Sequence, residues 1–211
     1  LEAYQYIASE WATIGRAYLM TILVTVIGTA LSLVITSTFA FAVSNDKLPG
    51  HKILMFLCIF TMLFNGGLVA SYYVYSNIFH IKNTIWALIV PTFLMSPFNV
   101  VLVKNYFSNS ISPSILEAAR MDGAGVFAVF TKIVMPLSVP IMATVGLMTA
   151  IGYWNDWTNG LYYLTENGGA QYYTIQLVLN RINENINFLA NNSDVAAKAA
   201  QPLTSTTMRM A

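Results

Sequence analysis

The stretch "SILEAARMDGAG" gathers three charged side chains, Glu117, Arg120 and Asp122, in a chain with few charges. Two neighbouring carboxylates can act together as a general acid and base. Glu117 and Asp122, however, lie about 140° apart around a helix, so they face different ways. Glu117 and Arg120 are spaced to form a weak ion pair along one helix face. The spacing argues against acid–base catalysis, and a solvated helix with one ion pair is the simplest interpretation.

The residues that flank these charges predict a short helix over 113–122. Ser112 carries a side chain that caps helix starts, and Pro113 suits the first helical position. Gly123 suits the position just past a helix end, where a left-handed backbone is common. The sequence thus predicts both ends of this helix from local residue types alone.

Ala118 and Ala119 support a second interpretation of the same helix. Small side chains let a helix sit deep in a groove of another protein, while Glu117 stays available for a basic partner. The spacing of the charges alone gives the solvated helix about even odds, and the two alanines shift the balance toward a docking helix.

Other residues that could do chemistry stand apart from one another. His51, His80 and Cys58 have no further ligands at metal-binding spacing, and Cys58 is most simply a packing residue. No serine, cysteine and histidine form a nucleophile arrangement, and no glycine loop with lysine is present to cradle a phosphate. We therefore expect no catalytic site, no metal and no cofactor in this chain.

Composition indicates a membrane protein. Charged residues make up 9% of the 211 residues, against roughly 25% in soluble domains. The formal net charge of +1 gives no basic field for nucleic acid, so nucleic acid is excluded as the main partner.

Four apolar runs position the charged stretch. They cover residues 17–45, 53–81, 83–103 and 133–154, and each is long enough for the roughly 20 helical residues that a bilayer needs. We expect neighbouring helices to satisfy the backbone groups that prolines in these runs release. The predicted fold class is an all-α, polytopic transmembrane helical bundle with four visible spans.

The four spans place segments 44–52 and 104–132 on one side of the membrane, and 77–83 with 156 onward on the other. Lys47, Lys52, Lys104, Arg120 and Lys132 all fall on the first side, so the positive-inside rule assigns it to the cytoplasm. The polar tail on the other side contains "YYTIQLVLNRI", which fits either a short strand or a surface helix.

At this point the motifs resemble a known family. "EAARMDGAG" followed by "IVMPLSVPIMA" is similar to the cytoplasmic signature, or EAA motif, of binding-protein-dependent ABC importer permeases. Glu117, Ala118, Ala119, Gly123 and Pro136 match it, and Met135 stands where leucine is usual. The stretches "LPGHK", "TMLFNGGLVASYYVY", "NTIWALIVP", "SPFNVVLVKNYF" and "GYWNDW" resemble the carbohydrate branch, so the similarity covers nearly the whole chain.

The resemblance implies the MetI-like permease fold, which usually has six spans. We therefore expect the first and last spans to be missing from this sequence. Residues 1–155 are expected to form the transmembrane permease domain, including the coupling loop 104–132. Residues 156–211 are expected to form an extracytoplasmic polar segment that leads to the missing last helix.

The resemblance also implies a function: a multi-pass permease subunit in a bacterial inner (cytoplasmic) membrane that moves a sugar or oligosaccharide. Its implied partners are two ATP-binding subunits, which bind the ATP, a homologous second permease and an extracytoplasmic solute-binding protein. ATPase coupling is implied for Glu117, Ala118, Ala119, Arg120, Asp122 and Gly123. The alternative is a non-transporting membrane scaffold that docks a cytoplasmic partner through the same helix.

Polar and aromatic residues within or beside the spans are candidates for the substrate path: Asn65, Tyr72, Asn99, Trp154 and Asn155. For Asn65 and Asn99, a hydrogen bond between helices is favoured over contact with a sugar, because polar groups at membrane depth need partners. For Tyr72 and Trp154, an interfacial aromatic belt is the default explanation.

Overall fold

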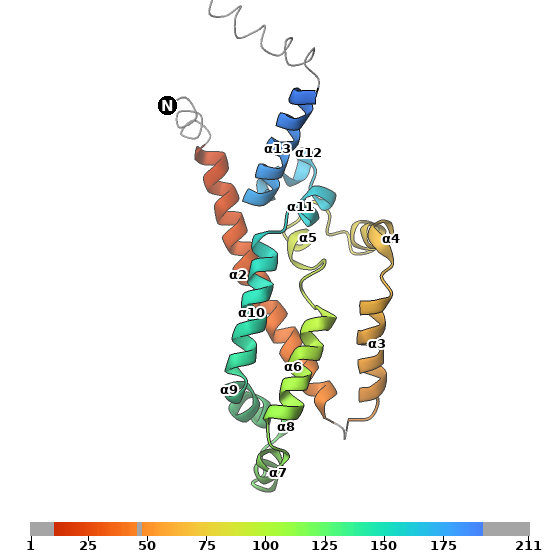
Figure 1. Cartoon of the computed structure of the whole chain (residues 1–211), viewed down its shortest axis with the longest axis vertical. Helices are drawn as coiled ribbons and strands as arrows, with labels where there is room; N and C mark the ends of the chain where they lie inside the picture. The colour runs from red at the N-terminus through yellow and green to blue at the C-terminus, as the bar shows by residue number, and fades with distance from the viewer. Residues whose placement is uncertain (1–10, 46–47, 192–211) are drawn as a thin grey trace, which may run out of the picture.

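The computed structural model describes residues 11–45 and 48–191, and the regular elements in this part of the chain are helices. Figure 1 shows them in an elongated bundle. In chain order they are α2 (Trp11–Ser44), α3 (His51–Leu63), α4 (Gly67–Tyr73), η1 (Val74–Ile78), α5 (Trp86–Ile89), α6 (Pro97–Ser110), α7 (Pro113–Met121), α8 (Val126–Val129), η2 (Phe130–Val134), α9 (Met135–Leu137), α10 (Val139–Trp154), α11 (Thr158–Tyr163), α12 (Glu166–Gly169), η3 (Ala170–Tyr172) and α13 (Ile175–Asn191). The predicted all-α membrane fold is confirmed.

Helix α2 is the longest element and packs against both α10 and α6 (Figure 1). Its section Ile14–Ser44 is long and apolar enough to cross a membrane. This section confirms the first predicted span, which begins three residues later at Ala17.

The second predicted span is bent. Helix α3 and the segment Gly67–Ile78 meet at an angle of 118°. The break falls at Asn65 and Gly66, and Gly67 has a left-handed φ of 79°, a conformation that glycine adopts at little cost. The fourth span is also bent, by 79°, between Val126–Leu137 and Val139–Trp154.

The third predicted span, 83–103, is not a continuous helix. It contains the short α5, a turn in which Thr92 has a φ of 69°, and the start of α6 at Pro97. Proline lacks an N–H and keeps the residue before it extended, and Ser96 has φ −89° and ψ 120°. Pro97 therefore starts a new helix, which runs past Val103 to Ser110.

The sequence predicts four spans, the third and fourth of which contain prolines. Among the described residues one helix meets the length and composition of a span, or three do if each bent pair counts as one span. Neighbouring helices satisfy backbone carbonyls in the interrupted third span, as expected. Ser32 donates a hydrogen bond to the Phe93 carbonyl at 3.0 Å, and Tyr153 donates one to the Ile89 carbonyl at 2.7 Å.

Two apolar cores lie along α2. The first, here called the lower core, surrounds Val100, Val103, Val134 and Val145, from α6, η2 and α10. The second, the upper core, contains Val24 of α2 with Leu88, Ile89, Tyr153 and Leu177. Figure 1 shows α7, α8 and α9 at the end of the molecule near the lower core, and α11, α12 and α13 at the opposite end.

The two ends match the two sides that the sequence assigns, because α7 and the end of α2 lie at one end of the bundle, away from α11 to α13 (Figure 1). The segment left open as strand or helix is the helix α13. Lys47 and the tail beyond residue 191 lie outside the described residues.

Replacing Gly28 with alanine is expected to weaken the α2–α10 contact. The new Cβ would lie 2.5 Å from Cζ of Tyr153, whose side chain is buried and cannot move aside freely. Overpacking of this kind costs about 1–3 kcal/mol, so the midpoint of thermal unfolding in detergent should fall. Gly15→Ala in the same helix is the control, because its Cβ meets nothing within 4 Å. Equal midpoints for the two variants would contradict the packing described.

Candidate functional site

Helix α7 begins where the sequence predicts, at Pro113, with Ser112 in an extended conformation before it. The Ser112 side chain, however, makes no capping hydrogen bond to the backbone. Its Oγ lies 2.7 Å from Oγ of Ser114 instead. Pro113, which has no N–H to satisfy, is the residue that sets the start of this helix.

The other end of α7 closes as expected at Gly123, whose φ is 81°. The Gly123 N–H donates to the Arg120 carbonyl at 3.1 Å, and the Ala124 N–H donates to the Ala119 carbonyl at 2.9 Å. These two bonds form a Schellman motif, which requires a left-handed residue just past the helix end. The glycine thereby turns the chain out of α7 toward α8.

Helix α7 rests on the bundle by a narrow edge. Leu116, Ala119 and Ala124 are half-buried and pack against the lower core. Of the alanine pair, only Ala118 is therefore exposed. Asp122 at the end of the helix is exposed as well, so most of the α7 surface stays open to a partner.

Exposed apolar side chains surround this helix, and sequence reasoning missed them as part of the site. Met121 is 89% exposed, Phe127 77% and Val126 68%, all in and just after α7. Large apolar side chains that protrude at the end of a molecule are typical of an interaction surface. In the sequence, their position between charged residues of a polar connecting loop could have identified them as part of the site.

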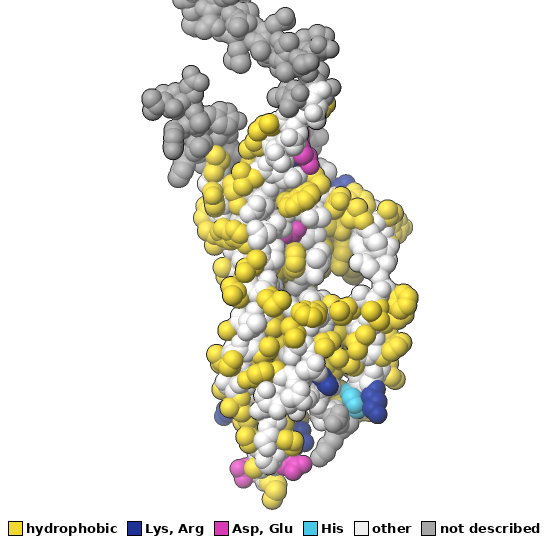
Figure 2. Space-filling view, viewed as in Figure 1, with side chains coloured by type: hydrophobic (Ala, Val, Ile, Leu, Met, Phe, Trp, Pro, Cys, Tyr) yellow, Lys and Arg dark blue, Asp and Glu magenta, His cyan; other side chains and the backbone are white. Residues whose placement is uncertain are grey.

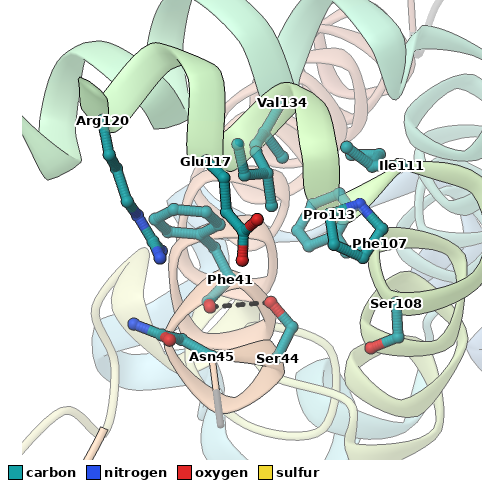
Figure 3. A pocket seen from close by; sticks show the side chains of 11 residues that line it. Phe41, Ser44, Asn45, Phe107, Ser108, Ile111, Pro113, Glu117, Arg120 and Val134 are labelled. Carbon is teal, nitrogen blue, oxygen red and sulfur yellow. Dashed lines mark hydrogen bonds between the residues drawn. The ribbon is translucent and has the colours of Figure 1, made fainter. Parts of the chain in front are cut away.

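Glu117 and Arg120 line a cavity of about 240 Å³ between α7 and the ends of α2 and α6. Figure 3 shows both side chains projecting from α7 toward Ser44 and Asn45 at the end of α2. Within the described part of the chain the two side chains do not pair with each other. The ion pair that the spacing allows is thus absent there, and both charges remain available at the cavity.

The five candidates for the substrate path do not form one site: Trp154 and Asn155 are neighbours at the end of α10, and Asn65, Tyr72 and Asn99 belong to other segments. Asn99 of α6 is buried, and its Nδ2 donates to Oγ1 of Thr149 in α10 at 3.3 Å, which is the favoured helix-to-helix bond. Asn65 is exposed, and its Oδ1 accepts the Gly67 N–H at 2.9 Å. This bond lies within the local turn between α3 and α4 and does not join two helices across the bundle, and contact of Asn65 with a sugar stays a prediction.

The aromatic candidates lie toward the opposite end from α7. Tyr72 accepts a hydrogen bond from Nζ of Lys82 at 2.9 Å and stacks on Tyr163, with ring centroids 5.8 Å apart. Trp154 and Asn155 lie at the end of α10, where both are exposed, and Asn155 donates to the Ile151 carbonyl. Tyr72 thus packs at the edge of the upper core.

Asp156 lies just beyond α10, two residues before the start of α11. Its Oδ1 accepts the N–H groups of Thr158 and Asn159, and its Oδ2 accepts Nδ2 of Asn159 at 2.6 Å. Burial raises the pKa of this carboxyl, and the hydrogen bonds oppose the rise. No group of three potential metal ligands occurs among residues 11–45 and 48–191.

Comparison with known proteins places the chain among transport components. The family model of the "binding-protein-dependent transport system inner membrane component" matches residues 29–200. The polygalacturonan/rhamnogalacturonan transport system permease protein YtcP of Bacillus subtilis is 40% identical over 182 residues, which are 86% of this chain and 61% of YtcP. Protein LplC of the same bacterium is 35% identical over 202 residues, 96% of this chain and 66% of LplC.

A solved structure is also similar. It is described as a bacterial ABC transporter involved in the import of the acidic polysaccharide alginate. The TM-score is 0.75 at 26% identity, and the match covers 92% of this chain and 75% of that one. The chain spans less than two thirds of the length of both curated relatives, 61% and 66%.

Replacing Gly123 with alanine should loosen the end of α7, because an alanine at φ 81° is strained although its Cβ meets nothing within 4 Å. The strain is about 1–2 kcal/mol, so hydrogen exchange at the Ala124 amide should speed up by about 5- to 30-fold. Gly125→Ala is the matched control, because Gly125 has φ −66° and equally open surroundings. Unchanged exchange in the Gly123 variant would contradict the motif.

Proposed function

This chain belongs to the family of binding-protein-dependent transport system inner membrane components, and we propose that it is the permease subunit of an ABC importer. In this proposal it forms half of the pathway for a sugar or oligosaccharide across a bacterial inner membrane. The observation that supports it most directly is the exposed helix α7 with Glu117, Arg120 and Met121.

In the proposed mechanism, α7 seats in a cleft of a separate ATPase subunit. Glu117 meets a basic residue there, and the exposed Met121 and Phe127 bury apolar surface against the same partner. The full assembly contains two ATPase subunits, a homologous second permease and an extracytoplasmic binding protein. This chain binds no ATP itself.

Motion of α7 reaches the membrane helices through close packing. Leu116 and Ala119 contact the lower core, which also contains Val103 of α6 and Val145 of α10. A packed core transmits displacement because it has few voids that could absorb it. When the ATPase subunits close, α7 moves and the bundle alternates between inward and outward openings.

The proposal of a carbohydrate substrate is based on the similar proteins. YtcP is described as a polygalacturonan/rhamnogalacturonan permease, and the solved importer as one for alginate. We propose a sugar or oligosaccharide as cargo for this chain as well. Asn65, Asn99 and Tyr72 lie apart from one another. Trp154 and Asn155 are neighbours and both are exposed, so they are the candidates to test for substrate contact.

Replacing Glu117 with lysine should abolish ATP-dependent uptake by the assembled transporter in proteoliposomes. Glu117 is exposed and has no ion pair within the described residues, so the change should leave the fold intact and act on the docked partner. A reversed charge in a basic cleft is repelled, which costs several kcal/mol. Glu117→Gln removes the attraction without adding repulsion, so its uptake should be intermediate.

Membrane insertion and co-purification of the second permease serve as controls and should be equal in all three proteins. Normal uptake by the lysine variant would show that Glu117 is not the docking contact. An assembled wild-type complex that hydrolyses ATP at the same rate with and without loaded binding protein would favour the scaffold instead of the importer.

A further inference from the structure

A second cavity lies at the α7 end of the molecule, between the end of α2, the start of α3 and α6. It has a volume of about 390 Å³ and is lined by Val43, His51, Lys52, Met55, Phe56, Ile59 and Lys104. The function proposed above makes no use of this cavity, which is called the basic cleft below. Figure 2 shows basic side chains and a histidine close together near that end of the molecule.

The polar part of the basic cleft favours an anion. Lys52 comes from α3 and Lys104 from α6, and the lining contains no carboxylate. Neither lysine pairs with a carboxylate in the described part of the chain. Two ammonium groups that converge from different helices without a counterion create a positive potential that a phosphate group would neutralise.

The start of α3 adds to this potential. Gly50 at the N-cap position has a left-handed φ of 84° and offers no side-chain hydrogen bond to the first turn. The first N–H groups of a helix carry partial positive charge and have no partners inside the helix. In α3 the His51 N–H donates to the Leu48 carbonyl at 3.3 Å, so the N–H groups that follow it are the ones that bear on this space. His51 and Lys52, in this first turn, both line the basic cleft, so the helix start and the two lysines act on the same space.

The remaining lining is apolar and continues along the helix. Met55, Phe56 and Ile59 follow Lys52 over the next two turns of α3, and Phe56 is 64% exposed. Cys58 is the one buried residue of α3, so most of this helix presents apolar side chains outward. Free phosphate would gain nothing from such a surface, whereas acyl chains would cover it.

We propose that the basic cleft binds an anionic phospholipid of the cytoplasmic leaflet. The phosphate lies against Lys52, Lys104 and the first turn of α3, and an acyl chain follows Met55, Phe56 and Ile59. Basic pockets between membrane helices on the cytoplasmic side recognise lipid headgroups by this combination of charge and apolar surface. Lys52 and Lys104 also fall on the side that the positive-inside rule assigns to the cytoplasm.

The test uses the assembled transporter with the full-length permease, purified in mild detergent. It is titrated with phosphatidylglycerol or phosphatidylcholine, and bound lipid is counted by native mass spectrometry. The wild-type complex should bind phosphatidylglycerol in preference to phosphatidylcholine. Lys52→Gln with Lys104→Gln should weaken that binding by about 30-fold, which corresponds to about 1 kcal/mol for each lysine.

Two further variants make the result specific. Lys132→Gln removes the same charge from an exposed site at the same end but outside the basic cleft, and it should leave lipid binding unchanged. Lys52→Arg with Lys104→Arg keeps both charges and should retain the lipid, which separates loss of charge from loss of fold. The thermal midpoints of all variants are measured alongside.

Three results would overturn the proposal. The first is equal binding of phosphatidylglycerol by the glutamine double variant and the Lys132 control. The second is displacement of the lipid by excess inorganic phosphate, which would make the basic cleft a phosphate site. The third is no preference between the two lipids in the wild-type complex, which would mean that another part of the assembly covers the cleft.

Discussion

A backbone carbonyl that leaves a helix in apolar surroundings must find another hydrogen-bond donor, and the bundle is organised around the donors that meet this need. Tyr153 of α10 is the main hydrogen-bond donor of this kind. Its hydroxyl donates to the Ile89 carbonyl at 2.7 Å, and its ring packs on Phe93 with centroids 5.2 Å apart. The ring also fills the space beside Gly28, where a Cβ would be 2.5 Å away. One side chain therefore joins α2, α10 and the broken segment around α5.

The same constraint acts between the two cores of the described part of the chain. The break between α5 and α6 lies between them, and Ser32 of α2 donates to the Phe93 carbonyl within that break. Below it, the hydrogen bond between Asn99 and Thr149 joins α6 to α10, two helices of the lower core. Helix α7 rests on this lower core, and the basic cleft opens beside it at the foot of α3. Partner docking and lipid binding are thus proposed for the same end of one packed unit.

At the opposite end, Asn83 holds the segment after α10 in place. It has a left-handed φ of 58°, and its Oδ1 accepts the Thr165 N–H at 2.7 Å, 82 residues along the chain. Its own N–H donates to the Tyr163 carbonyl at 3.0 Å. Oγ1 of Thr21 accepts the Ile175 N–H and so ties the start of α13 to α2. These hydrogen bonds hold in place a polar segment whose composition alone does not predict an ordered structure.

Sequence by itself determined the features that depend on neighbouring residues. Long charge-free runs predicted the apolar helices, and Pro113 and Gly123 predicted the ends of α7, because proline geometry and the left-handed helix exit are properties of single residues. Only the tertiary structure decided that Pro97 starts a helix instead of kinking one, that Asn99 bonds another helix while Asn65 serves a turn, and that Glu117 faces a cavity without pairing with Arg120. Each of these outcomes depends on which distant group lies within hydrogen-bonding or packing distance, and residue spacing along the chain does not contain that information.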